Sequence, residues 1–325
     1  MKKCFLLLFA VLLFSCSSKK ETQIIKYEGF VFGTTYHITI LHEQKINFQK
    51  SIDSLFFLVN KSLSTYISTS DVSKINSGDS TIIVDELFAE VFKKSKRIFK
   101  ETDGYFDPTV GNLVNAWGFG PNESKKEIDS LSIQKMIQFV GLDKVKLKNN
   151  KIEKQFQETY LDFNSIAKGF GIDVVGRFLE SKNVQDYLVE IGGEIRARGK
   201  NKKGNFWKVA IEKPNTDGTQ SFQTTIQLEN ESMATSGNYR KFRMTKNGKK
   251  YVHTVNPKTG FAKESNMLSA SVIANSDCAD VDAYATAFMA MGFEKTKSSL
   301  KKYNHIKVIL IYLNKDNLIE EFRNF

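Results

Sequence analysis

The chain has 325 residues, of which 41% are hydrophobic and 26% charged, a composition that suits a soluble globular protein of one large domain or two. Its formal net charge of +11 favours anionic partners such as nucleotides, phosphates or lipid headgroups. Because the lysines are scattered, with neither an arginine-rich stripe nor zinc-ligand spacing, we expect no nucleic-acid partner.

The first residues have the pattern of a secretory signal. Two lysines precede an apolar run over residues 5–14, which is too short to span a membrane. The Leu-Phe-Ser-Cys sequence ending at Cys16 resembles a bacterial lipobox and predicts a lipidated cysteine, with an ordinary signal peptide as the alternative. We expect a lipoprotein signal peptide over 1–15, a lipidated N-terminus and tether over 16–28, and a folded unit over 29–325.

Along the body of the chain, clustered helices and hairpins predict an α+β fold with mostly antiparallel sheets. The expected strands are two within Tyr27–Leu41, Gln157–Leu161, two within Tyr187–Arg198 around a Gly-Gly bend, Trp207–Glu212, Phe222–Leu228, Leu268–Ala274 and Val308–Leu313. The expected helices are Phe48–Leu63, Asp85–Lys100, Ser132–Val140, one running through Val174–Leu179, and Asp280–Met291. Met233–Gly237 is expected to be a small-residue turn, and Asn247-Gly248 the turn of a hairpin.

The segment Leu161–Asp173 is the strongest single indication of a ligand site. A strand that passes into a helix through polar and small residues leaves backbone N–H groups available to an anion. Lys168 adds a positive charge, and Gly169 and Gly171 are expected to let a ligand approach closely. The alternative is that Asp162 only begins the helix and Lys168 is solvated.

Two further segments contribute candidates. Ala116–Pro121 holds Trp117, Gly118 and Phe119, a set able to form a wall against which a flat ring stacks, although such aromatics also serve as core. His253 precedes a Pro-Gly turn, where it is either a general base, a phosphate contact or a structural residue.

Asp282 and Thr286 are four residues apart on the last long predicted helix and therefore share a face. With a backbone carbonyl they form an oxygen-only set suited to Mg²⁺. Alternatively, Asp282 is a helix cap and Thr286 bonds its own backbone. No Walker-type loop and no Gly-x-Ser-x-Gly motif occurs in the sequence.

Eight segments together resemble the ApbE family, the FAD:protein FMN transferases of bacterial envelopes, over nearly all of Phe30–Leu313. They are Phe32–Thr34, Ser64–Tyr66, Phe106–Gly120, Asp162–Gly169, Gly192–Gly199, Ala234–Gly237, His253–Gly260 and Asp282–Thr286. Two positions depart from the family pattern: Phe32 replaces a usual Met, and Asn256 replaces a usual Asp before Pro-x-Thr-Gly.

The resemblance implies a single catalytic unit of two packed lobes that splits FAD and transfers FMN, with Mg²⁺, to a Thr or Ser hydroxyl of an acceptor protein, releasing AMP. It implies that His253 and Asp282 are catalytic and that Ser165, Asp282 and Thr286 bind the metal. The implied FAD contacts are Phe32, Tyr66, Trp117, Gly118, Phe119, Asp162, Lys168 and Val255.

Family analogy further suggests acceptors among subunits of sodium-pumping quinone reductases or Rnf-type complexes, and a place at the inner membrane facing the periplasm. Two other functions remain open from the sequence. One is a Mg²⁺-dependent FAD pyrophosphatase that gives FMN and AMP, and the other is a flavin-binding lipoprotein without catalysis.

Overall fold

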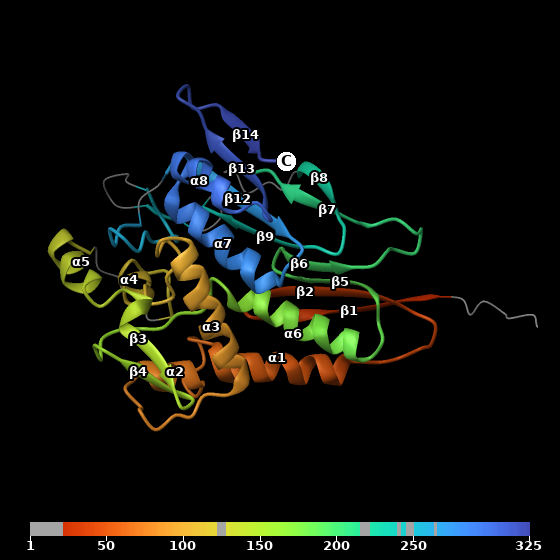
Figure 1. Ribbon diagram of the computed structural model, residues 1–325, viewed down its shortest axis with the longest axis horizontal. Helices are drawn as coiled ribbons and strands as arrows, with labels where there is room; N and C mark the ends of the chain where they lie inside the picture. The colour runs from red at the N-terminus through yellow and green to blue at the C-terminus, as the bar shows by residue number, and fades with distance from the viewer. Residues whose placement is uncertain (1–21, 122–127, 215–221, 239–241, 245–249, 263–264) are drawn as a thin grey trace, which may run out of the picture.

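An eight-stranded sheet runs through the computed structural model, which describes residues 22–121, 128–214, 222–238, 242–244, 250–262 and 265–325 (Figure 1). The strand order is β1-β2-β5-β6-β9-β12-β13-β14, and all neighbours are antiparallel. The strands are β1 (Gln23–Val31), β2 (Thr34–His42), β5 (Asp186–Ile191), β6 (Glu194–Arg198), β9 (Ser232–Gly237), β12 (Met267–Ala274), β13 (Lys307–Leu313) and β14 (Ile319–Arg323). The expected antiparallel α+β fold is confirmed.

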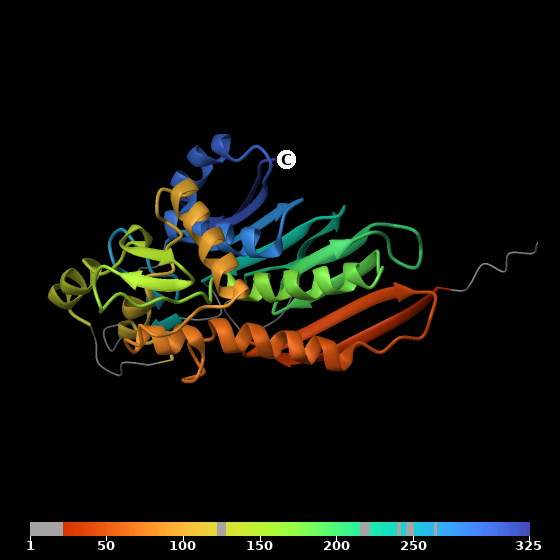
Figure 2. The same cartoon turned by 60° about the horizontal axis from the view of Figure 1, so that its bottom comes forward.

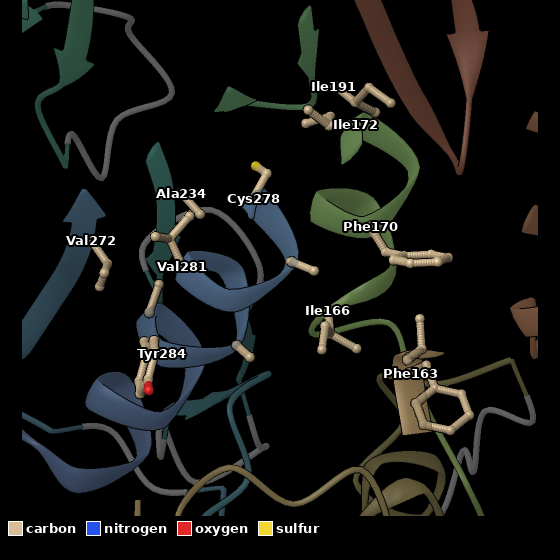
Figure 3. Packing of buried hydrophobic residues seen from close by; sticks show 14 of the residues in the cluster. Phe163, Ile166, Phe170, Ile172, Ile191, Ala234, Val272, Cys278, Val281 and Tyr284 are labelled. Carbon is tan, nitrogen blue, oxygen red and sulfur yellow. The ribbon is translucent and has the colours of Figure 1, made fainter. Parts of the chain in front are cut away.

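Four long helices build the main hydrophobic core together with strands of the sheet. Figures 1 and 2 show how these helices lie beside the sheet. They are α1 (Gln49–Leu63), α3 (Glu86–Glu101), α6 (Ala167–Ser181) and α7 (Cys278–Met291). Helix α7 is buried on nearly every side, packing on α6, β9 and β12. Small residues such as Ala283 and Ala287 permit this close packing, and Figure 3 shows α6 and α7 contributing to one apolar cluster.

The remaining helices and strands lie outside the main sheet and the four long helices. They are α2 (Asp71–Asn76), α4 (Gly111–Ala116), α5 (Ser130–Ile137), α8 (Phe293–Ser299), η1 (Leu142–Lys144), η2 (Leu300–Lys302), β3 (Val145–Lys148), β4 (Lys151–Lys154), β7 (Trp207–Glu212), β8 (Phe222–Leu228), β10 (Phe242–Met244) and β11 (Lys250–Val252). The predicted Asn247-Gly248 turn between β10 and β11 lies outside the described residues, as do the leader and Cys16. No helix in the described ranges is long and apolar enough to cross a membrane.

Strand β6 is covered on both faces, which explains why apolar and charged residues alternate along it. Ile195 and Ala197 pack with the β7–β8 hairpin in a second apolar cluster. Glu194 and Arg196 point the opposite way, where each meets a charged side chain of α6. Both charged residues are buried, with 3% and 5% exposure.

Two of the secondary-structure predictions are wrong. Residues 233–237 belong to β9 in the middle of the sheet, because their small side chains fit beneath α7. Residues 157–161 form no strand and make only a single bridge, between Tyr160 and Val110. The Asn76 side chain instead satisfies both the N–H and the C=O of Leu161, at 2.8 Å each, in place of a neighbouring strand.

The β1–β2 hairpin turns through Phe32 and Gly33, whose φ angles are 52° and 76°. Two positive φ values are typical of a type I′ turn, in which a first-position Phe costs about 1–3 kcal/mol. The strained backbone directs the Phe32 ring inward, where it packs edge-on against Phe56 at 5.6 Å.

Candidate functional site

A cavity of about 890 Å³ lies where the loop after α1, the start of α6, β6, β9 and α7 meet. This volume is at the upper end for small-molecule pockets. It collects ten of the twelve predicted site residues outside the leader: Phe32, Tyr66, Phe119, Asp162, Ser165, Lys168, His253, Val255, Asp282 and Thr286. The other two, Trp117 and Gly118, are not among its lining residues.

Trp117 and Phe119 belong to a third apolar cluster, beside α4 and α5. The indole N–H of Trp117 donates to the Gly260 carbonyl at 2.8 Å, so this side chain ties the wall to the turn after His253. Phe119 lines the cavity while only 5% exposed. Within this segment, Trp117 is therefore a core residue, whereas Phe119 belongs to the core cluster and also forms part of the cavity wall.

Asp162 is held by local backbone geometry and does not begin a helix. Its N–H donates to the Pro108 carbonyl at 2.7 Å, and its Oδ1 accepts from the Asn164 N–H at 2.9 Å. Helix α6 begins only at Ala167. The buried Asp162 carboxyl thus remains at the cavity wall.

The three residues expected to bind a metal, Ser165, Asp282 and Thr286, all line the cavity. Asp282 lies in the second turn of α7 and accepts from the Gly169 N–H at 3.1 Å, so it is not a cap. The Thr286 hydroxyl lies 3.2 Å from that of Ser236 on β9. Within the described ranges, no three His, Cys, Asp or Glu side chains gather around one point. A metal here would therefore be held by one carboxylate and neutral oxygens, a donor set that fits Mg²⁺ supplemented by phosphate or water.

Lys168 is paired inside the cavity, contrary to the solvated alternative. Its Nζ lies 2.5 Å from Glu194 Oε1, with side-chain exposures of 30% and 4%. Burial by itself would lower the pKa of Lys168, but the Glu194 and Asp282 carboxylates outweigh it and raise that pKa. Burial raises the pKa of Glu194 to about 7 against the opposing effect of Lys168, and it also raises the pKa of Asp282.

The two glycines of α6 serve packing and not ligand approach. A Cβ at Gly169 would lie 2.4 Å from the Cys278 carbonyl oxygen, and one at Gly171 would lie 2.4 Å from the Phe32 ring. The first glycine lets α6 touch the start of α7, and the second makes room for a cavity wall. Both therefore shape the site through neighbouring protein segments.

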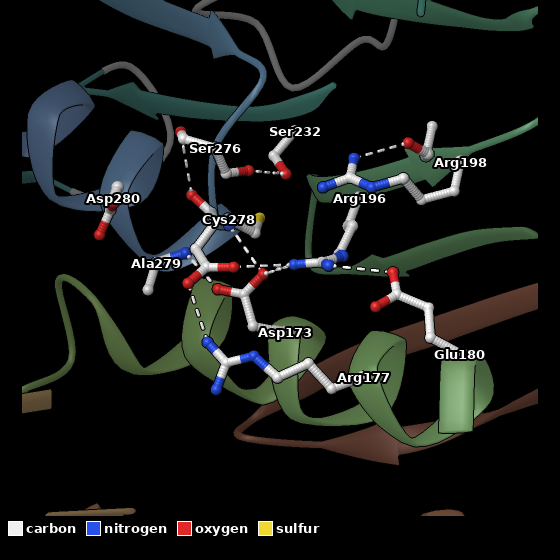
Figure 4. A network of polar contacts seen from close by, with 12 residues as sticks. Asp173, Arg177, Glu180, Arg196, Arg198, Ser232, Ser276, Cys278, Ala279 and Asp280 are labelled. Carbon is white, nitrogen blue, oxygen red and sulfur yellow. Dashed lines mark hydrogen bonds and ion pairs between the residues drawn. The ribbon is translucent and has the colours of Figure 1, made fainter. Parts of the chain in front are cut away.

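A buried polar network fixes the start of α7, as Figure 4 shows. The fully buried Asp173 accepts from the N–H groups of Cys278 and Ala279, at 2.8 and 2.9 Å. Arg196 donates to Asp173 and Asp277, at 2.8 and 2.9 Å. Because Asp173 satisfies two otherwise free N–H groups, it sets the position of the helix that carries Asp282 and Thr286.

His253 and Val255 both line the cavity, on the segment that follows β11. The turn after them depends on Asn256, whose Oδ1 accepts from the Lys258 N–H at 2.9 Å. Its Nδ2 donates to the Ala290 carbonyl at the end of α7, at 3.2 Å. An aspartate has no N–H to make the second bond, so Asn256 has a structural role of its own.

Sequence reasoning assigned no role to Glu194 or Ser236. Both lie in segments that carry the family resemblance, and the strand alternation around Glu194 indicates a shared face with Arg196. Nothing local in the sequence indicates that this face meets Lys168, or that Ser236 meets Thr286.

Comparison with known proteins finds a matching family, similar sequences and similar solved structures. The sequence model of the ApbE family matches residues 32–310. The chain is 37% identical to an FAD:protein FMN transferase of Haemophilus influenzae, covering 93% of this chain and 90% of the relative, and 35% identical to one of Vibrio cholerae, covering 97% and 95%. The fold is similar to the solved structure of the flavin transferase ApbE from Vibrio cholerae, with a TM-score of 0.82, 33% identity, and coverage of 93% and 97%. It is also similar to the apo flavinyl transferase ApbE of Pseudomonas stutzeri, with a TM-score of 0.83, 27% identity, and coverage of 93% and 95%.

Proposed function

The chain belongs to the ApbE family, and from that premise we propose that it transfers FMN from FAD, with Mg²⁺, to a Thr or Ser hydroxyl of an acceptor protein. Its curated relatives are enzymes named for flavin transfer, which supports transfer over flavin storage. The observation that carries the proposal is the cavity in which Lys168, His253, Asp282 and Thr286 all meet.

The reaction exchanges the phosphoanhydride bond of FAD for a phosphoester bond to the acceptor. The acceptor hydroxyl forms a bond to the FMN phosphorus, the anhydride bond to AMP breaks, and AMP leaves with the electron pair. His253 lines the cavity and is the group we assign to receive the hydroxyl proton. Lys168 would face the charge that develops on the phosphoryl oxygens.

Asp282 and Thr286 would hold Mg²⁺, with Ser165 contributing through its main chain. The metal when bound would neutralise pyrophosphate charge and assist in-line displacement. The ring-binding end would be formed by Phe32, Tyr66, Phe119 and Val255, which line the same cavity. Tyr66 is 59% exposed, and an aromatic ring at the cavity is the kind of group on which a flavin would stack.

The test is a mixture of protein from Lys20 onward, FAD, Mg²⁺ and a candidate acceptor domain. We expect the acceptor to gain the mass of one FMN, AMP to appear, and both to stop with EDTA. AMP and free FMN without labelling of any acceptor tried would favour the pyrophosphatase. FAD that stays intact with Mg²⁺ in the presence of every acceptor tried would contradict both reactions. In parallel, Asp282→Asn should abolish transfer while the protein stays folded; Mg²⁺-dependent transfer retained in this variant would refute the metal assignment.

We further propose that Cys16 is lipidated and holds the enzyme at the bacterial envelope, at the inner membrane facing the periplasm. This placement would bring it to exported subunits of sodium-pumping quinone reductases or Rnf-type complexes. Metabolic labelling with a fatty acid should mark the wild type and not Cys16→Ser. Equal labelling of both proteins would refute lipidation at this residue.

A further inference from the structure

The cavity is acidic although its proposed ligand, the pyrophosphate of FAD, is an anion. Its described lining contains four carboxyl groups, on Asp107, Asp162, Glu194 and Asp282. Against these stand one lysine, Lys168, and one histidine among the same lining residues. Such a lining opposes a pyrophosphate unless a cation accompanies it.

Glu194 is placed to occupy Lys168 before any substrate arrives. It projects from β6 toward the start of α6 and holds the ammonium at 2.5 Å. Its other oxygen, Oε2, is buried without a hydrogen-bond partner among the described residues. A carboxylate satisfied on one side only is a strong competitor for a nearby ammonium.

We propose that Glu194 is a positioning residue that couples FAD binding to metal binding by holding Lys168 away from the pyrophosphate until the cation is present. The inference rests on the proposed function, since it takes FAD and Mg²⁺ as the ligands of this cavity. In the metal-free protein, FAD meets a neutralised lysine and three further carboxyls. A cation held at Asp282 and Thr286 offsets the negative charge of the cavity. FAD and the cation therefore each favour the binding of the other.

The coupling is reciprocal, so it can be measured from either ligand. The titration follows quenching of flavin fluorescence at pH 8 without acceptor, in EDTA and in Mg²⁺, with chromatography to confirm that FAD stays intact. Wild-type protein should bind FAD more than about tenfold tighter with Mg²⁺. In Glu194→Gln, which keeps the size of the side chain, metal-free FAD affinity should rise about tenfold, while the affinity for Mn²⁺ measured without FAD should fall.

This pair of opposite changes separates a charge effect from a structural one, because loss of structure would weaken both ligands. The matched control is Glu190→Gln on the neighbouring strand β5. Glu190 lies outside the cavity lining and accepts the Gly193 N–H at 2.6 Å, a bond that Gln retains. Both affinities should match the wild type in this control.

Two outcomes would overturn the inference. The first is wild-type FAD affinity that differs by less than twofold between EDTA and Mg²⁺, a result that requires no variant. The second is folded Glu194→Gln whose metal-free FAD affinity is unchanged or lower. Because both measurements are of binding without an acceptor, a failure to label a chosen acceptor leaves the inference standing. Conversely, transfer can be Mg²⁺-dependent in chemistry even if the coupling is absent.

Discussion

Replacing Gly169 by Ala tests whether the contact between α6 and α7 sets the geometry of the site. The new Cβ would lie 2.4 Å from the Cys278 carbonyl oxygen, 2.6 Å from its carbon and 2.7 Å from the Ala279 nitrogen. All three atoms are backbone, and Asp173 binds the same two residues through their N–H groups. No side chain can turn away to relieve the contact.

The expected magnitude follows from these distances. An ordinary Cβ contact begins at 3.4 Å, so the helices must separate by 3.4 − 2.4 = 1.0 Å. Overpacking of this kind costs about 1–3 kcal/mol, and the better helix propensity of Ala returns up to about 1 kcal/mol. We expect a net loss of about 1–2 kcal/mol and a fall in Tm of about 2–4 °C. Because Asp282 moves with α7 and loses the Gly169 N–H bond, transfer should fall by about 100-fold.

Thermal unfolding and FMN transfer to a fixed acceptor measure the two effects. Gly171→Ala is the comparison, since it has the same gain in helix propensity but meets the end of the Phe32 ring instead of backbone. We expect Gly171→Ala to lower Tm less than Gly169→Ala does. It should change the affinity for FAD more than the dependence of transfer on the metal. A Gly169→Ala protein with Tm within 1 °C and activity within about twofold of wild type would refute the reasoning, because the contact could then relax freely.

Three further outcomes are expected. Asn256→Asp should lower stability by about 1–3 kcal/mol at neutral pH, because an ionised carboxylate would face the Ala290 carbonyl, and urea unfolding should show part of the loss recovered in acid. Arg196→Met should cost about 3–5 kcal/mol by leaving Asp173 and Asp277 without their shared partner; Arg196→Lys should not restore it, and a loss below 1 kcal/mol would contradict the pairing. Burial opposes ionisation of Asp277, but neighbouring cations prevail and hold its pKa below the usual 3.8, so its contribution is present above that pH and is lost as the pH falls below it. Asp277→Asn should therefore flatten the acid limb of a stability–pH curve, and an unchanged limb would exclude this group as its source.

Local order along the chain determined much of the fold and part of the site. Helical spacing was enough to place Asp282 and Thr286 on one face of α7, because positions four apart always share a face. The strands of Tyr27–Leu41 and Tyr187–Arg198 also follow from their own alternation and turn residues. Family resemblance then collected most of the cavity-lining residues.

The features that the sequence did not predict correctly depend on contacts between segments far apart in the chain. The small residues of β9 were expected to turn, but packing beneath α7 makes them a central strand. The glycines of α6 were expected to face a ligand, but they face Cys278 and Phe32. A propensity describes what a segment prefers by itself, whereas burial against a partner decides what it adopts.

The charged residues of β6 show the same difference between what the sequence determines and what the tertiary structure decides. Alternation alone determines that Glu194 and Arg196 point to one side, since successive residues of a strand face opposite ways. Only the tertiary structure decides that this side is closed by α6, where the two residues meet Lys168 and Asp173. The two pairs join residues 26 and 23 positions apart in the sequence. Such pairs form because the faces that carry them are buried together, and that burial depends on residues throughout the chain.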